Sequence, residues 1–214
     1  MTRDYQKGLA EALALAPVVP VMVIENVEDA VPLAKALVKG GLPVLEITLR
    51  TAKAMDCIRA IIAEVEGAIV GSGTVLTPEQ LRDSYRLGCT FAVSPGSTGR
   101  LLGAAEDYEI ALLPGGVTAS ECMALLEWGY AIQKFFPAEP AGGVPYLSSL
   151  ASPLPQIRLC PTGGITPETA PQFLALPNVK VCGGSWLCPK DAMQTGDWAR
   201  ITQLAREAQA LRAA

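Results

Sequence analysis

Residues 68–94 read AIVGSGTVLTPEQLRDSYRLGCTFAVS and contain two apolar, β-branched segments separated by a more polar one. The apolar segments, Ala68 to Val75 and Phe91 to Ser94, predict two short strands buried on both faces. Between them, Thr77-Pro78-Glu79-Gln80 predicts the start of a helix. A threonine N-cap with a glutamine three residues later forms a capping box, and proline is favoured at the first helical position. This stretch therefore predicts a parallel strand-helix-strand unit.

The same alternation extends along the whole chain, and we expect eight strands, each followed by a helix. The expected strands are Val18 to Ile24, Val44 to Leu49, Ala68 to Val75, Phe91 to Ser94, Ala111 to Leu113, Ala131 to Phe136, Ile157 to Cys160 and Val179 to Cys182. Eight units favour an α/β fold, a single (β/α)8 TIM barrel over residues 1–214, although an open doubly wound sheet shows the same alternation.

Several helices have sequence signals at their ends. Thr118 to Glu121 predicts a second capping box, and Thr166-Pro167 predicts the start of the helix after the seventh strand. Pro32 fits the first of the eight helices if that helix begins near Asp29. The last helix should begin near Asp197, with one apolar stripe formed by Ile201, Leu204, Ala205, Ala208 and Leu211. An extra N-terminal helix, around Tyr5 to Ala16, is expected to cover the floor of the barrel.

Composition excludes several classes of function. The net charge is −4, with acidic and basic residues interspersed, so the sequence has no basic patch. Nucleic acid and anionic membranes are therefore disfavoured as partners. The N-terminal segment lacks the pattern of a secretory leader, and no apolar run is long enough to span a bilayer, so we expect a soluble, cytoplasmic protein. The six cysteines lack C-x-x-C spacing and are expected to be reduced and mostly buried.

The chain contains no histidine. This excludes a serine-histidine-aspartate triad, a cysteine-histidine pair and a zinc site built on histidine. We expect no metal and no cofactor.

Lys134 stands near the end of an apolar strand, in Ala131-Ile-Gln-Lys-Phe-Phe-Pro137. Alternation places Ile132, Lys134 and Phe136 on one face, so Lys134 should point into the barrel mouth if Phe136 does. Burial disfavours the charged ammonium and favours the free amine that attacks a carbonyl carbon. The alternatives are a lysine that extends its ammonium to the rim or that pairs with a carboxylate.

A second polar group follows the second strand, in Leu45-Glu-Ile-Thr-Leu-Arg-Thr51. Glu46, Thr48 and Arg50 should share one face of this strand. A buried carboxylate near a lysine can transfer protons, and a guanidinium can hold a substrate carboxylate in two parallel hydrogen bonds. The alternative is a Glu46–Arg50 ion pair that only stabilises the rim.

Glycines follow three of the expected strands, in Gly71-Ser-Gly-Thr-Val75, Pro161-Thr-Gly-Gly-Ile165 and Gly183-Gly-Ser-Trp186. The last two stand where barrels bind phosphate, because glycine lets backbone N–H groups approach an anion. Any one glycine pair is also typical of a tight turn. Two pairs at adjacent strand ends, with the Ser185 hydroxyl, predict a phosphate site.

These segments closely resemble the bacterial 2-keto-3-deoxy-6-phosphogluconate (KDPG) aldolases, also known as 4-hydroxy-2-oxoglutarate (KHG) aldolases. The resemblance covers nearly the whole chain, and rests on VVPVMVI, LEITLRT, GSGTVL, Ser94-Pro95-Gly96, KFFPAE, CPTGGI and GGSWL. It implies a class I lyase that forms a Schiff base and splits a phosphorylated keto sugar acid into pyruvate and an aldehyde. It also implies a homotrimer, which no other feature of the sequence indicates.

The resemblance also implies a role for each residue of the site. Lys134 would form the Schiff base with the keto-acid substrate, and Glu46 would act as general acid and base. The implied substrate-binding residues are Arg50 and Thr74 at the pyruvyl carboxylate, Phe136 and Pro95 at its carbon skeleton, Thr162 near the new hydroxyl, and Gly163, Gly164, Gly184 and Ser185 at the phosphate.

Two other functions remain compatible with these residues. One is a barrel isomerase or epimerase of a sugar phosphate, in which Lys134 and Glu46 move protons without covalent chemistry. The other is a protein that binds a phosphorylated sugar acid without catalysis.

Overall fold

A computed structural model describes residues 4–211, so residues 1–3 and 212–214 of the expected single domain lie outside the described residues. All strand pairs in it are parallel. The strands of the described part of the chain are β1 Val18–Met22, β2 Val44–Thr48, β3 Ile69–Gly73, β4 Phe91–Val93, β5 Ala111–Leu113, β6 Ile132–Phe135, β7 Arg158–Pro161 and β8 Cys182–Gly184.

The strands form a curled parallel arrangement in two sheets. Six strands pair in the order β5-β4-β3-β2-β1-β8, and β6 pairs with β7. Isolated parallel bridges link the sheets, from Gly115 to Lys134 on one side and from Leu159 to Val179 and Thr162 to Gly183 on the other. The predicted α/β class is confirmed, but the strands do not pair in one continuous eight-stranded sheet.

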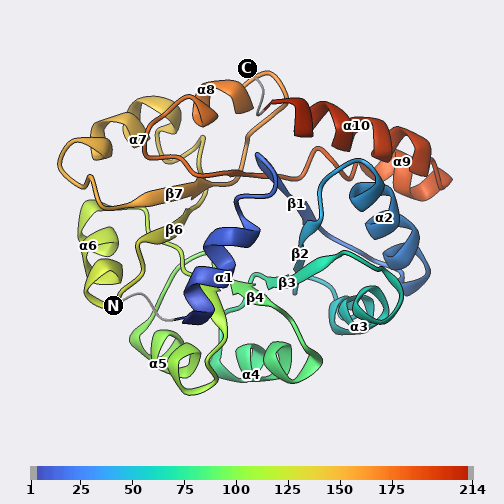
Figure 1. Cartoon of the computed structure of the whole chain (residues 1–214), viewed down its shortest axis with the longest axis horizontal. Coiled ribbons are helices and arrows are strands. Elements are labelled where there is room, and N and C mark those ends of the chain that lie inside the picture. The colour runs from blue at the N-terminus through green and yellow to red at the C-terminus, as the bar shows by residue number, and fades with distance from the viewer. Residues whose placement is uncertain (1–3, 212–214) are drawn as a thin grey trace.

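The helices lie outside the strands, except that α1 crosses the middle of the ring in Figure 1. Their bounds are α1 Asp4–Ala12, α2 Val27–Lys39, α3 Ala54–Glu64, α4 Pro78–Leu87, α5 Gly99–Asp107, α6 Ala119–Glu127, α7 Gly143–Ala151, α8 Ala170–Leu174, α9 Lys190–Thr195 and α10 Trp198–Ala210. The expected N-terminal helix is therefore present, but it ends at Ala12 rather than Ala16.

Two of the predicted helix starts are confirmed by their hydrogen bonds. Thr118 and Glu121 form the reciprocal capping box at α6. Thr77 accepts from the backbone N–H of Gln80 at α4, but the Gln80 side chain accepts from Leu76 rather than from Thr77. Both patterns satisfy N–H groups that have no partner within the helix.

Two helix starts differ from the prediction. Helix α2 begins at Val27 and contains Pro32, whose missing N–H removes only one hydrogen bond near the helix start. After β7, Thr166 and Thr169 exchange hydrogen bonds in a turn, and α8 begins only at Ala170. The short polar side chains compete with the helix for its backbone groups.

Alternation along the strands separates an inner core from an outer core. The inner core lies among the strands, next to Leu9 of α1 and to Leu13 just after it, and contains Val19, Val44, Phe91, Val93, Ala111, Leu113, Cys160 and Val181. The outer cores pack the strands against the surrounding helices. Helix α1 therefore covers one end of the inner core, as expected from the sequence.

All six cysteines are free, and Cys188 alone is only partly buried, which confirms the expectation of reduced, mostly buried thiols. Between residues 4 and 211, no helix combines the length and the apolar character that crossing a bilayer requires.

Candidate active site

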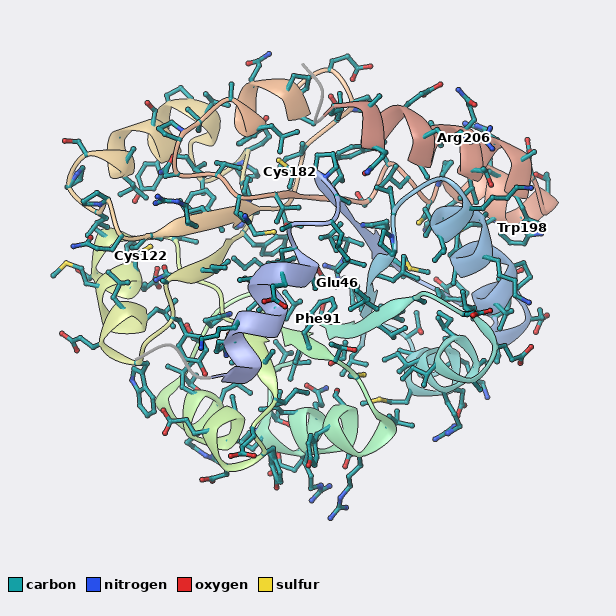
Figure 2. The ribbon with its side chains drawn as sticks, in the orientation of Figure 1. Glu46, Phe91, Cys122, Cys182, Trp198 and Arg206 are labelled. Atoms are coloured by element: carbon teal, nitrogen blue, oxygen red, sulfur yellow. The ribbon has the colours of Figure 1, made fainter. Side chains whose placement is uncertain are left out.

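Two strands far apart in the sequence direct charged side chains into the inner core. On β2, Val44 belongs to the inner core while Leu45 and Ile47 pack outward, so Glu46 points inward. On β6, Ile132 packs against the inner core and Phe135 packs outward, so Lys134 also points inward. Figure 2 shows Glu46 near the centre of the ring of strands.

Lys134 and Glu46 form a buried ion pair. Nζ of Lys134 donates to Oε1 of Glu46 over 3.1 Å, and each side chain is only 4% exposed. Lys134 therefore pairs with a carboxylate, one of the alternatives that the sequence left open. Nζ also lies 5.7 Å from the centroid of the Phe136 ring, within the range of a cation–π contact.

Arg50 and Thr74 lie side by side at the ends of β2 and β3. Nε of Arg50 donates to Oγ1 of Thr74 over 3.3 Å. Arg50 is exposed and lies two residues beyond the end of β2, so it does not continue the inward face of Glu46 and Thr48. Among the described side chains, Glu46 pairs with Lys134 and not with Arg50, so the expected alternative of a Glu46–Arg50 pair is wrong.

Thr74 has an unusual backbone. Its φ is +58°, in the left-handed region where threonine is disfavoured. Such strain costs on the order of 1–3 kcal/mol and persists where the surrounding structure requires it.

The loop that holds Pro95 contacts the strand of Lys134 through Gly115. A Cβ on Gly115 would lie 2.2 Å from the carbonyl oxygen of Pro95, so only glycine fits there. Gly115 in turn bridges to Lys134, whose backbone N–H donates to Pro114. Pro95 is partly buried at this place.

The residues predicted to bind phosphate lie just after β7 and at the end of β8. Gly163 and Gly164 follow β7 with φ of +104° and +80°, and a Cβ on Gly163 would lie 3.2 Å from the Phe136 ring. Gly184 is the last residue of β8, so the Gly183-Gly184 pair lies within the strand and not after it as predicted. Ser185 follows it and is exposed.

Thr162 is a buried hydroxyl among these residues. The residue is 6% exposed, and its Oγ1 has no hydrogen-bond partner within the described protein. It fits against β8 because Gly183 has no side chain: a Cβ there would lie 2.2 Å from Oγ1. A buried hydroxyl without a partner is costly, and Thr162 shares this state with other buried polar side chains of the described chain, such as Ser72 and Asn178.

Cys160 lies opposite Lys134 in the β6–β7 register. Burial raises the pKa of its thiol to about 12, with the Lys134 charge acting in the opposite direction. Cys160 is therefore a neutral thiol near pH 7 and not a thiolate nucleophile.

An open groove of about 810 Å³ borders the end of β8. Its lining includes Val21, Ser185 and Lys190, together with the acidic residues Glu25, Glu28 and Asp29. In the part of the chain that the structure describes, no group of three or more Asp, Glu, Cys or His side chains could hold a metal ion.

Sequence patterns gave no separate role to Gly73 or Cys160, and they placed Gly183 in a phosphate-binding pair rather than against Thr162. A Cβ on Gly73 would lie 2.4 Å from Oε1 of Glu46, and Gly183 makes the corresponding space for Thr162. Strand alternation gives a signal for Gly73, because it places a glycine on the inward face of β3, the strand that pairs with the β2 strand of Glu46.

Comparison with known proteins agrees with this geometry. The family model described as "Aldolase: KDPG and KHG aldolase" matches residues 9–204. The chain belongs to the KDPG and KHG aldolase family. A KHG/KDPG aldolase of Escherichia coli strain K12 is 52% identical over 206 residues, which cover 96% of this chain and 97% of the relative.

Solved structures of other KDPG aldolases have the same fold. The KDPG aldolase of Zymomonas mobilis ZM4, solved with 3-phosphoglycerate, matches with a TM-score of 0.91 and 48% identity, over 96% of this chain and 97% of the other. The KDPG aldolase of Legionella pneumophila matches with a TM-score of 0.91 and 44% identity, over 94% and 97%. In that structure, pyruvate is captured as a covalent carbinolamine intermediate.

Proposed function

We propose that this aldolase reversibly cleaves 2-keto-3-deoxy-6-phosphogluconate to pyruvate and glyceraldehyde 3-phosphate, and that it also accepts 4-hydroxy-2-oxoglutarate, giving pyruvate and glyoxylate. The observation that carries the proposal is the buried contact of 3.1 Å between Lys134 and Glu46. Relatives named KDPG or KHG/KDPG aldolase at about half identity support the choice of substrate.

In the first step, Lys134 acts as the nucleophile. Transfer of one ammonium proton to Glu46 leaves a neutral amine in a site with little water, where the charged forms are costly. The amine attacks C2 of the keto acid to give a carbinolamine; Glu46 then returns the proton to the carbinolamine hydroxyl, which leaves as water and gives a protonated imine. This imine accepts electrons more readily than the ketone does.

In the second step, Glu46 acts as general base, directly or through a water molecule. It takes the proton of the C4 hydroxyl as the C3–C4 bond breaks, and the electron pair of that bond moves to C2–C3 to form an enamine. The phosphorylated aldehyde leaves. Protonation of the enamine at C3 and hydrolysis of the imine then release pyruvate and regenerate Lys134.

The remaining residues would bind the substrate. We assign the pyruvyl carboxylate to Arg50 and Thr74, whose side chains already contact each other. A guanidinium binds a carboxylate strongly through paired hydrogen bonds. Phe136 and Pro95 would pack against the pyruvyl carbons, and the unpartnered hydroxyl of Thr162 would bind the hydroxyl formed at the new bond.

The phosphate would bind at the ends of β7 and β8. Gly163 and Gly164 offer backbone N–H groups in a conformation suited to glycine, and the hydroxyl of Ser185 faces the groove. Gly184 would contribute its backbone at the end of β8. None of these groups carries a charge, so phosphate would be bound through hydrogen bonds.

We also propose the larger features that the family implies. The two sheets would form one closed (β/α)8 barrel across their isolated bridges, and the whole chain would be a single domain. We expect a homotrimer in the cytoplasm. Light scattering of the purified protein at several concentrations tests the trimer.

Mass spectrometry tests the covalent step. The protein is incubated with pyruvate and borohydride in the presence of a chelator and then digested for peptide mapping. We expect a pyruvate-sized adduct on Lys134 and none on Lys180, an exposed lysine just before β8 that serves as an internal control. A folded protein without an adduct on Lys134 would contradict the aldolase mechanism and favour proton transfer or simple binding.

A further inference from the structure

The inward face of β3 carries glycine where its neighbours carry side chains. Ile69 packs against the inner core and Val70 packs outward, so Gly71 and Gly73 also face inward. A Cβ on Gly73 would meet Oε1, Cγ and Cδ of Glu46 at 2.4, 2.6 and 2.8 Å. Real Cβ atoms do not approach other atoms so closely, so Glu46 occupies the space that a side chain on residue 73 would fill.

The backbone of Gly73 does not itself require glycine. Its φ is not among the positive values found in the described chain, so an alanine could adopt the same conformation. The three nearest atoms to its hypothetical Cβ all belong to the Glu46 side chain. Space for Glu46 is therefore the reason that the structure gives for glycine here.

We propose that Gly73 is a positioning residue for the aldolase reaction. By leaving its Cβ space open, it lets the Glu46 side chain lie against β3, and it thereby holds Oε1 within 3.1 Å of Nζ of Lys134. The proposal rests on the proposed function, since it concerns the group that transfers protons in that reaction.

The structure predicts a specific defect for Gly73→Ala. An added methyl group meets the Glu46 side chain from Cγ to Oε1, so that side chain must change its χ1 rotamer to move away, while the backbone can stay in place. The fold should survive, but the carboxylate should leave its place beside Lys134. Lys134 would remain, and its ammonium proton can pass to water before the attack, whereas proton transfer at C3 needs a base held beside the substrate, so the proton-transfer steps at carbon should suffer more than imine formation.

Two measurements with pyruvate separate these steps. Borohydride trapping on Lys134 reports imine formation, and exchange of the methyl protons with deuterium oxide, followed by NMR, reports enamine formation. For Gly73→Ala we expect trapping within about threefold of the unmodified protein. We expect exchange to be slower by about 30-fold or more, which is part of the rate increase that a general acid–base residue typically provides. Gly103→Ala, whose methyl group would meet no atom within 4 Å, should change neither.

A stability measurement keeps the proposal testable if Gly73→Ala folds poorly. Any loss of stability that Gly73→Ala causes in the natural sequence should disappear in a Glu46→Ala background, because the clashing side chain is then gone. A loss that persists there would overturn the proposal, as would equal losses of trapping and exchange or unchanged exchange. If the unmodified protein neither traps pyruvate nor exchanges its protons, the proposed function itself fails.

Discussion

Replacing one residue of the Lys134–Glu46 pair should lower the stability of the protein strongly, whereas replacing both should change it little. At the observed 3.1 Å, the attraction between the two charges is about 5 kcal/mol for an effective dielectric constant of about 20. Removing water from two side chains that are each 4% exposed costs several kcal/mol per ion and offsets this attraction. The net contribution of the intact pair to stability is therefore small.

Replacing one partner alone leaves an uncompensated buried charge. Lys134→Met and Glu46→Met should each lower the free energy of unfolding by about 3–5 kcal/mol. The double variant fills the same space with two apolar side chains, so it should unfold within about 1 kcal/mol of the unmodified protein or be more stable. Both single variants and the double variant should fail to cleave substrate.

Unfolding in guanidinium chloride, followed by circular dichroism at pH 7 and at one fixed protein concentration, measures these differences. Two results would refute the reasoning. Single variants that lose less than about 1 kcal/mol would mean that the remaining charge is solvated. A double variant as unstable as the sum of the single variants would mean that the site cannot hold an apolar pair.

Three further predictions follow from individual residues. Thr74→Gly should relieve its backbone strain and raise stability by about 1 kcal/mol, while the Michaelis constant for pyruvate-forming substrates rises because the hydroxyl is lost; an unchanged constant in steady-state kinetics would exclude a role in binding. Gly183→Ala should push the side chain of Thr162 out of its place, since its Cβ would lie 2.2 Å from Oγ1, and slow cleavage measured by pyruvate release, whereas full activity would contradict this packing. Hydrogen bonds from the backbone N–H groups of Thr118 and Val117 lower the pKa of Glu121 below its ordinary 4.5. This cap therefore stabilises the protein above that pH, and its contribution is lost as the pH falls through the lowered pKa. Glu121→Gln should melt at a lower temperature at pH 7, and melting curves in which this deficit persists near pH 3 would contradict the prediction.

The sequence predicted which residues share a strand face with Lys134 and with Glu46, because the period of two is fixed by strand geometry. It did not decide which face points inward, because both faces of these strands carry apolar residues and are buried. It did not predict that Lys134 and Glu46 contact each other. That contact depends on how strands from opposite sides of the ring are arranged, which no local pattern encodes.

Boundaries at the ends of strands were predicted less well. The Gly183-Gly184 pair looked like a turn, but it continues β8 because Thr162 and Trp186 fill the space where side chains would be. Arg50 was expected to share a strand face with Glu46 and Thr48, yet the strand ends at Thr48 and the alternation ends with it. In both places, tertiary packing outweighs the local signal.

The two residues of the ion pair are 88 positions apart in the chain, on β2 and β6. The site therefore exists only after the first and second halves of the protein have docked, and neither half holds a working nucleophile and base by itself. Two fragments divided in the exposed turn between α5 and β5 would each be inert, and recovery of pyruvate trapping on mixing would report their assembly. Chemistry at this lysine is thus also a readout of complete folding.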